Sequence, residues 1–143
     1  MKIIKNILKN ILFEVISFKK VDIKPFGTNS MSNEEIEITH KPRSFRDKNG
    51  NIYYIYVDYG TTIGVYNENM DQIAYMNLTK NKDQKTYSAK GVISYGIYVD
   101  ENYRRNGIAT AMHDYANLVL GYNTTPSDML LPDAQAFWKS RLK

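Results

Sequence analysis

The chain has 143 residues, enough for one domain with a buried core, and 43% of them are hydrophobic, as in ordinary globular proteins. It contains no cysteine and only two histidines, so a disulfide framework, a cysteine nucleophile and a histidine-rich metal cluster are excluded. The net charge of +4 and the pI of about 9.1 suit an anionic partner: a nucleotide cofactor, RNA or an acidic protein. We find no apolar run of bilayer length and no secretory signal, and expect one cytoplasmic domain over residues 1–143.

Residues 2–19 carry the clearest helical pattern. Apolar residues recur in pairs every four positions and lysines fall towards the other side, which predicts an amphipathic helix. The apolar residues are Ile3, Ile4, Ile7, Leu8, Ile11, Leu12, Val15 and Ile16, and the lysines are Lys2, Lys5 and Lys9. Such a helix could lie on a membrane or on nucleic acid, but we favour one whose apolar face covers one side of a sheet.

An antiparallel meander is predicted after a loop at residues 24–30. Ile36 and Ile38 alternate with glutamates, as in a half-exposed strand over Glu34 to Thr39. Asn49-Gly50 accepts the positive φ angles of a tight turn, which predicts a hairpin at residues 47–51. Further strands are predicted at residues 52–59, 61–66, 72–79 and 91–99, with a polar loop at residues 80–85.

Tyrosine occurs 12 times, and four of these residues cluster: Tyr53, Tyr54, Tyr56 and Tyr59. With lysines nearby, their rings could stack on nucleic-acid bases. Tyrosine is also a strand former whose ring is commonly half buried, and we favour that interpretation, so nucleic acid is the less favoured partner.

Residues 95–119 change period in the middle. β-Branched and aromatic residues predict a buried strand up to Val99, and from Ile108 onward apolar residues fall on one helical face. Between them lies the polar turn Arg104-Arg105-Asn106-Gly107. A helix start leaves backbone N–H groups unpaired and carries the positive end of the helix dipole, and glycine and alanine leave that backbone bare. The pattern therefore predicts a helix start that can take a phosphate.

The spacing Arg104-x-x-Gly107-x-Ala109, after a strand ending in Val99-Asp100, resembles the acyl-CoA signature R/Q-x-x-G-x-G/A of the GNAT superfamily of N-acetyltransferases. The resemblance implies an α+β fold in which helices cover both faces of a mixed, mostly antiparallel sheet. It also implies acetyl-CoA as acyl donor, with pantetheine along the fourth strand and pyrophosphate on the amides of the turn. Carried over to this chain, the cofactor-binding residues are Ile97, Tyr98, Val99, Arg104, Arg105, Asn106, Gly107, Ile108, Ala109 and Thr110.

The last part of the chain continues the resemblance and also departs from it. Residues 120–127 correspond to the family's fifth strand, and Ala134-x-Ala136-Phe137-Trp138 is similar to its last conserved helix, with Trp138 where many members have tyrosine. The family's helix pair between the first two strands and its last two strands are not visible. We therefore expect an open acceptor side, which suits a macromolecular amine such as a protein, or a pocket that a partner completes; the oligomeric state, a dimer included, stays open.

Acetyl transfer to an amine requires a polarised thioester carbonyl, a neutral amine and a protonated leaving thiolate. Backbone N–H groups near Ile97 to Val99 would supply the first. Glu101 or Asp100 is a candidate to take the amine's proton. The indole of Trp138 is no usable acid, so the thiolate's proton would come from Tyr98, Tyr95, Ser127 or water. The candidate catalytic residues are Glu101, Tyr98 and Ser127.

Two other functions stay open from the sequence: a GNAT-fold protein that binds CoA or a protein without catalysis, and a nucleic-acid-interacting protein. The histidines do not decide among them. His113 lies off the apolar stripe of the central helix and is expected at the surface, and His40 lies in a predicted loop. Neither is proposed as catalytic.

Overall fold

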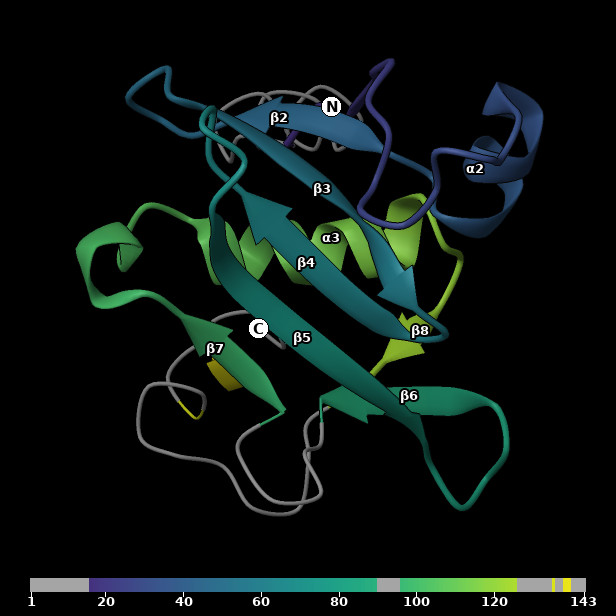
Figure 1. Ribbon diagram of the computed structural model, residues 1–143. Coiled ribbons are helices and arrows are strands. Elements are labelled where there is room, and N and C mark those ends of the chain that lie inside the picture. The colour runs from purple at the N-terminus through teal and green to yellow at the C-terminus, as the bar shows by residue number, and fades with distance from the viewer. Residues whose placement is uncertain (1–15, 90–95, 126–134, 136–137, 140–143) are drawn as a thin grey trace, which may run out of the picture.

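The computed structural model describes residues 16–89, 96–125, 135 and 138–139. Within these residues the chain forms an α+β fold with a curled, mostly antiparallel sheet and two helices (Figure 1). The helices are α2 (Asn33–Thr39) and α3 (Ile108–Leu118), and a short 3-10 turn, η1, spans Glu101–Tyr103. The strands are β1 (Lys19–Lys20), β2 (Arg43–Arg46), β3 (Ile52–Tyr59), β4 (Thr62–Tyr66), β5 (Gln72–Lys80), β6 (Thr86–Ala89), β7 (Ile97–Val99) and β8 (Asn123–Thr124).

The sheet has the order β1-β2-β3-β4-β5-β6-β8, and β7 pairs with β5 beside this path. Every pair is antiparallel except β6 with β8, which is parallel. The strands β6 and β7 share one side of β5: β7 pairs with Ala74–Met76 and β6 with Leu78–Lys80. They are therefore two successive parts of one edge, which Figure 1 shows along β5.

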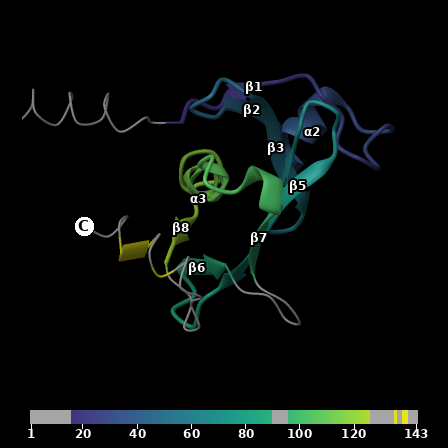
Figure 2. The same cartoon turned by 90° about the vertical axis from the view of Figure 1, so that its left-hand side faces the viewer.

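The core lies between the sheet and α3. The strand register aligns Ile55, Val65, Ala74 and Val99 across β3, β4, β5 and β7, all on the side that packs against the helix. Helix α3 contributes the buried residues Ile108, Ala111, Met112, Tyr115 and Ala116. Figure 2 shows the sheet curling around this helix. Register shifts in β3 after Val57 and in β4 after Val65 increase the local twist, as β-bulges do, and so favour the curl.

The hairpin and three strands of the meander are confirmed. Gly50 has φ 84°, and the Asp47 carboxylate accepts hydrogen bonds from the amides of Asn49 and Asn51 at 2.8 and 2.9 Å. The strands β3, β4 and β5 match their predicted ranges within one residue. The strand β6 was not predicted. Of the predicted strand at residues 91–99, the part from 91 to 95 lies outside the described residues, and Ile97–Val99 form β7.

The strand predicted over Glu34 to Thr39 is wrong, because these residues form α2. Its start is capped by Ser32: the Glu35 amide donates to Ser32 Oγ at 3.1 Å, and that hydroxyl donates to Glu35 Oε1 at 3.2 Å. Ile36 is buried, whereas Ile38 is 72% exposed. An alternation of two isoleucines is too short to outweigh a helix start of this kind.

The predicted helix over residues 2–19 does not extend to its predicted end. Residues 16–18 are not helical, and Lys19 and Lys20 form β1 opposite Ser44 and Arg43 of β2. The ring of Phe18 packs edge-on against Phe45 and Tyr115, each at 5.8 Å between centroids. This aromatic contact and the pairing with β2 favour an extended chain there. The remainder of the prediction, residues 2–15, lies outside the described residues.

Neither helix of the described chain has the length and apolar run that a bilayer crossing requires.

Candidate cofactor site at the start of α3

Strand β7 presents part of its backbone at an open edge. Towards β5, Gly96 O accepts from the Asn77 amide at 2.7 Å, and the Asp100 amide donates to Ile73 O at 2.8 Å. Successive residues of a strand direct their N–H and C=O groups to opposite edges, so those of Ile97 and Val99 point away from β5. No strand of the described residues pairs with that edge of β7. Backbone donors and an acceptor are therefore open to a ligand there.

The turn after β7 is held by its own side chains. The Asp100 carboxylate accepts from the Asn102 amide at 3.0 Å and caps η1. Arg104 Nε donates to Val99 O at 2.9 Å, which ties the turn to the end of the strand. Arg105 has φ 65°, in the left-handed region. Since Arg104 occupies the Val99 carbonyl, the groups left at the open edge are the Val99 N–H and the N–H and C=O of Ile97.

Helix α3 begins with bare amides. Its N-cap is Gly107, with φ 83° and ψ 14°, and no side chain caps the helix. The first bond of the helix runs from the Ala111 amide to Gly107 O at 2.9 Å, and no described group accepts from the amides of Ile108, Ala109 or Thr110. A Cβ built on Gly107 would meet no atom within 4 Å. Gly107 is exposed, Ala109 and Thr110 are half-buried, and Ile108 is buried. Unpaired N–H groups and the positive end of a helix dipole are the features that favour an anion at a helix start.

Strand β8 pairs with β6 and not with β7. It follows α3 and pairs with β6, Asn123 opposite Thr86 and Thr124 opposite Tyr87. Helix α3 leads from the end of β7 to β8. Strand β8 runs parallel to β6, which pairs with the same side of β5 as β7 does, as Figure 1 shows. The open edge of β7 and the bare start of α3 adjoin one another, because only the turn at residues 100–107 separates them.

Of the three predicted catalytic residues, the structure describes Tyr98 and Glu101. Tyr98 points to the sheet face opposite α3, is 43% exposed, and stacks on Tyr75 at 5.7 Å between ring centroids. Glu101 lies exposed in η1, and Asp100 is engaged as a cap. Ser127 lies outside the described residues.

The prediction that His113 lies at the surface is wrong. It is only 3% exposed, and its ring meets the indole of Trp138 edge-on at 5.1 Å between centroids. Trp138 is itself 7% exposed. The apolar face of α3 is wider than the predicted stripe, because Trp138, distant in sequence, covers the side on which His113 lies.

The clustered tyrosines do not form one stacking surface. Tyr53 faces the core at 2% exposure and donates to Asp47 Oδ2 at 3.0 Å, and burial together with this bond raises its pKa to about 12. Tyr56, on the other face of β3, is also buried, and only Tyr59 is largely exposed. Their alternation along β3 places neighbouring rings on opposite sides of the sheet.

Sequence reasoning missed a polar cluster around Asp58 of β3. Tyr66 donates to Asp58 Oδ1 at 2.7 Å, and the Tyr66 ring stacks on Tyr56 at 4.5 Å between centroids. Burial raises the pKa of the Asp58 carboxyl, and the Tyr66 bond opposes that rise. An aspartate inside an otherwise apolar strand is unusual for its position, and this signal in the sequence could have drawn attention to it.

Among the described residues, no three histidine, aspartate or glutamate side chains lie close enough to hold a metal ion. Comparison of the chain with known protein families, with curated proteins and with solved structures found no match in any of the three.

Proposed function

We propose that the chain is a GNAT-like N-acyltransferase that uses acetyl-CoA and transfers the acetyl group to an amine. The observation that carries this proposal is the corner at which the open edge of β7 meets the bare start of α3. Backbone hydrogen bonding along a strand and anion binding at a helix start are the two demands that pantetheine and a diphosphate make. A further support is that β8 pairs with β6, so that among the described residues no strand covers the outer edge of β7.

In this proposal, the edge groups of Ile97 and Val99 bind pantetheine, and the amides of Ile108, Ala109 and Thr110 bind the pyrophosphate. Arg105, exposed beside Gly107, adds positive charge to the same corner. Acetyl-CoA, when bound, supplies the activated acyl group. A backbone N–H at the β7 edge would polarise its carbonyl, and Glu101 and the Tyr98 hydroxyl are the nearest candidates in sequence for moving the proton.

The proposal also includes three features of the domain organisation, the helix arrangement and the cellular location. They are a single cytoplasmic domain, helices on both faces of the sheet, and an N-terminal amphipathic helix packed on it. The acceptor is a macromolecular amine, as expected for an open acceptor side. The exposure of Tyr98 supports an open acceptor side, because this residue lies on the sheet face opposite α3, beside the edge where the thioester would lie.

A non-catalytic CoA-binding or protein-interaction module is the second candidate. It is favoured by the burial of Trp138 against His113, because an indole in that position supplies no acid for a leaving thiolate. A nucleic-acid function has less support, since Tyr53 and Tyr56 are buried.

Turnover separates the two main candidates. We expect acetyl-CoA to bind, and free CoA thiol to appear when a lysine-containing peptide is added. Tyr98→Phe should lower kcat by about 10²-fold or more if its hydroxyl carries the proton, with cofactor binding unchanged. Tyr75→Phe, which changes the stacking partner on the same face, is the matched control and should leave kcat unchanged. Binding without turnover would favour the non-catalytic module. Absence of binding would remove the transferase and the CoA-binding module and leave only a protein-interaction module.

A further inference from the structure

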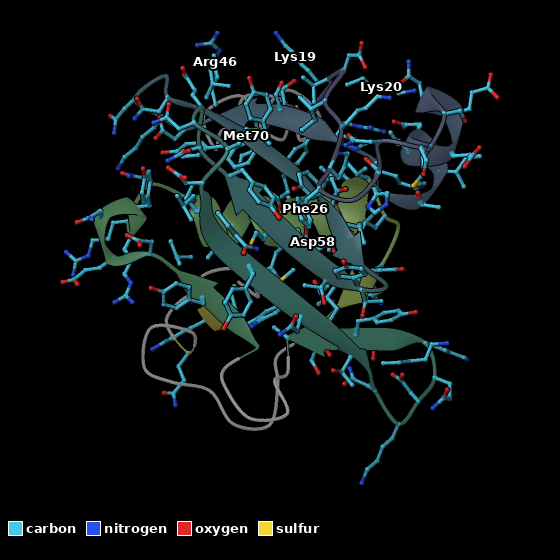
Figure 3. The ribbon with its side chains drawn as sticks, in the orientation of Figure 1. Lys19, Lys20, Phe26, Arg46, Asp58 and Met70 are labelled. Carbon is cyan, nitrogen blue, oxygen red and sulfur yellow. The ribbon has the colours of Figure 1, made fainter. Side chains whose placement is uncertain are left out.

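A cavity of about 310 Å³ lies between the end of β3 and the segment that leads into and out of α2. Its apolar lining includes Phe26, Met31 and Val57, and its polar lining includes His40 and Asp58. Figure 3 shows Phe26 and Asp58 over the same part of the sheet. The volume is at the lower end of the range for small-molecule sites, so only a small ligand or one end of a larger ligand fits.

Among the described residues, no lysine or arginine pairs with the Asp58 carboxylate, and His40 is the basic side chain that lowers its pKa. Tyr66 donates to its Oδ1 at 2.7 Å, and Gln72 Nε2 lies 3.5 Å from its Oδ2, at the limit of a hydrogen bond. The ion pairs formed among the described residues join Glu37 to Arg43 and Lys20, and none involves Asp58. Partial burial raises its pKa. A desolvated carboxylate of this kind is stabilised by any cation that can reach it.

Gly64 makes room for this arrangement. A Cβ on Gly64 would lie 2.6 Å from Asp58 Oδ2 and 2.7 Å from the Tyr66 hydroxyl. The sheet therefore accommodates the carboxylate by omitting a side chain on the neighbouring strand, while it supplies no positive charge.

His40 lies beside this carboxylate with a defined tautomer. Its Nδ1 is 2.5 Å from Val57 O. A carbonyl oxygen only accepts, so Nδ1 carries the proton, and in the neutral ring Nε2 is left as an acceptor.

We propose that this cavity binds the ammonium group of a primary amine, with Asp58 as its counterion. The rings of Phe26 and Tyr59, which are 95% and 80% exposed, flank the mouth and add an attraction between the cation and their π faces. An anion is disfavoured, because it would meet Asp58. The site is separate from the proposed cofactor corner, since β4 and β5 lie between β3 and β7 in the sheet. It goes beyond the proposed function and does not rest on it.

The test is a two-dimensional ¹⁵N–¹H NMR titration of the full chain, without acyl donor, using butylammonium chloride as probe. We expect the amides of residues 57–60 to shift with butylammonium and not with butan-1-ol at the same concentration and ionic strength. Asp58→Asn keeps the size and an acceptor for Tyr66, and should weaken binding about tenfold, because a charge-assisted bond becomes a neutral one. Asp71→Asn, at an exposed position in the turn before β5, is the control and should leave the affinity unchanged. Equal shifts with the alcohol, no shifts, or full affinity in Asp58→Asn would overturn the proposal.

If Asp58→Asn fails to fold, the proposal can still be tested by measuring how the affinity of the wild type for butylammonium depends on pH. The groups that face Asp58 are His40, Tyr66, Tyr56 and Gln72. Tyrosine hydroxyls and alkylammonium groups have ordinary pKa values of about 10. The tyrosines and the probe therefore keep their protons between pH 4 and pH 8. Affinity should therefore fall as the pH falls and Asp58 takes up a proton. In His40→Gln the fall should persist, owing to Asp58 alone. An affinity independent of pH would contradict an ammonium bound to this carboxylate.

Discussion

Gly64 and Asp58 show how one position in a strand constrains another across the sheet. An added Cβ at Gly64 would lie 2.6 Å from Asp58 Oδ2 and 2.9 Å from Tyr66 Cε2. We expect Gly64→Ala to destabilise the protein by about 1–3 kcal/mol in urea unfolding, since a rigid stacked ring must move. In an Asp58→Ala background the same change should cost less, because the carboxylate is gone. Strictly additive effects would show that the close approach has no energetic consequence.

The ion pair between Glu37 and Arg43 joins α2 to β2. It predicts how the stability of the protein depends on pH. Arg43 donates to the two Glu37 oxygens at 2.6 and 2.9 Å, and this bond lowers the pKa of the Glu37 carboxyl. The folded state therefore binds fewer protons than the unfolded chain. The stabilisation is complete above the ordinary glutamate pKa and is lost as the pH falls through the folded-state pKa.

Glu37→Gln should accordingly lower the free energy of unfolding at pH 7 by no more than about 1 kcal/mol, because the pair is partly exposed. The difference from wild type should vanish at acid pH. Glu68→Gln, at an exposed position in the turn between β4 and β5, is the control and should show neither effect. Urea unfolding at both pH values measures this; a difference that does not change with pH would contradict the pair.

Two local sequence patterns predict different structures for the segment that forms α2. The alternation of Ile36 and Ile38 indicates a strand, and the sequence Ser32-x-x-Glu35 indicates a helix start. The helix forms because the Ser32 side chain caps the Glu35 amide and because Ile36 can be buried while Ile38 stays exposed.

The cap can be tested directly. Ser32→Ala should lower the free energy of unfolding by about 1 kcal/mol, because the Glu35 amide loses its acceptor. Ser30→Ala, two residues earlier in the exposed turn, should have an effect close to zero. Equal effects of the two substitutions would mean that the cap does not stabilise α2.

Local chemistry explains which elements could be predicted. The hairpin depends on Asn49-Gly50, and α3 depends on a glycine start and a helical stripe, so both are visible in a short window of sequence. The division of one edge into β6 and β7 depends on pairing with different parts of β5, and the cluster at Asp58 depends on Tyr66 and Gly64 of the next strand. Contacts between strands carry no signal within a single window.

At the scale of the whole molecule, the curled sheet holds α3 against its inner side and directs the start of that helix to the end of β7 (Figure 2). The bare amides were predicted from Gly107 and Ala109, because a helix start is a local feature. The open edge beside them was expected only through the resemblance, since an unpaired edge is a property of the assembled sheet. The proposed function depends on the two occurring together.

Gly107 and Gly50 offer a matched pair for testing that claim. They have φ 83° and 84°, and a Cβ on either would meet no atom within 4 Å. Gly107→Glu and Gly50→Glu therefore carry the same backbone strain and the same change of charge, one at the proposed diphosphate corner and one in a distant hairpin.

The most direct measurement is the thermal stability of wild type and both variants with increasing acetyl-CoA. At a hundred times its Kd, a ligand bound only by the folded state stabilises it by about 2.7 kcal/mol. We predict that wild type and Gly50→Glu are stabilised alike, and that Gly107→Glu is not. No stabilisation of the wild type by millimolar acetyl-CoA, or equal stabilisation of all three proteins, would contradict a cofactor site at the start of α3.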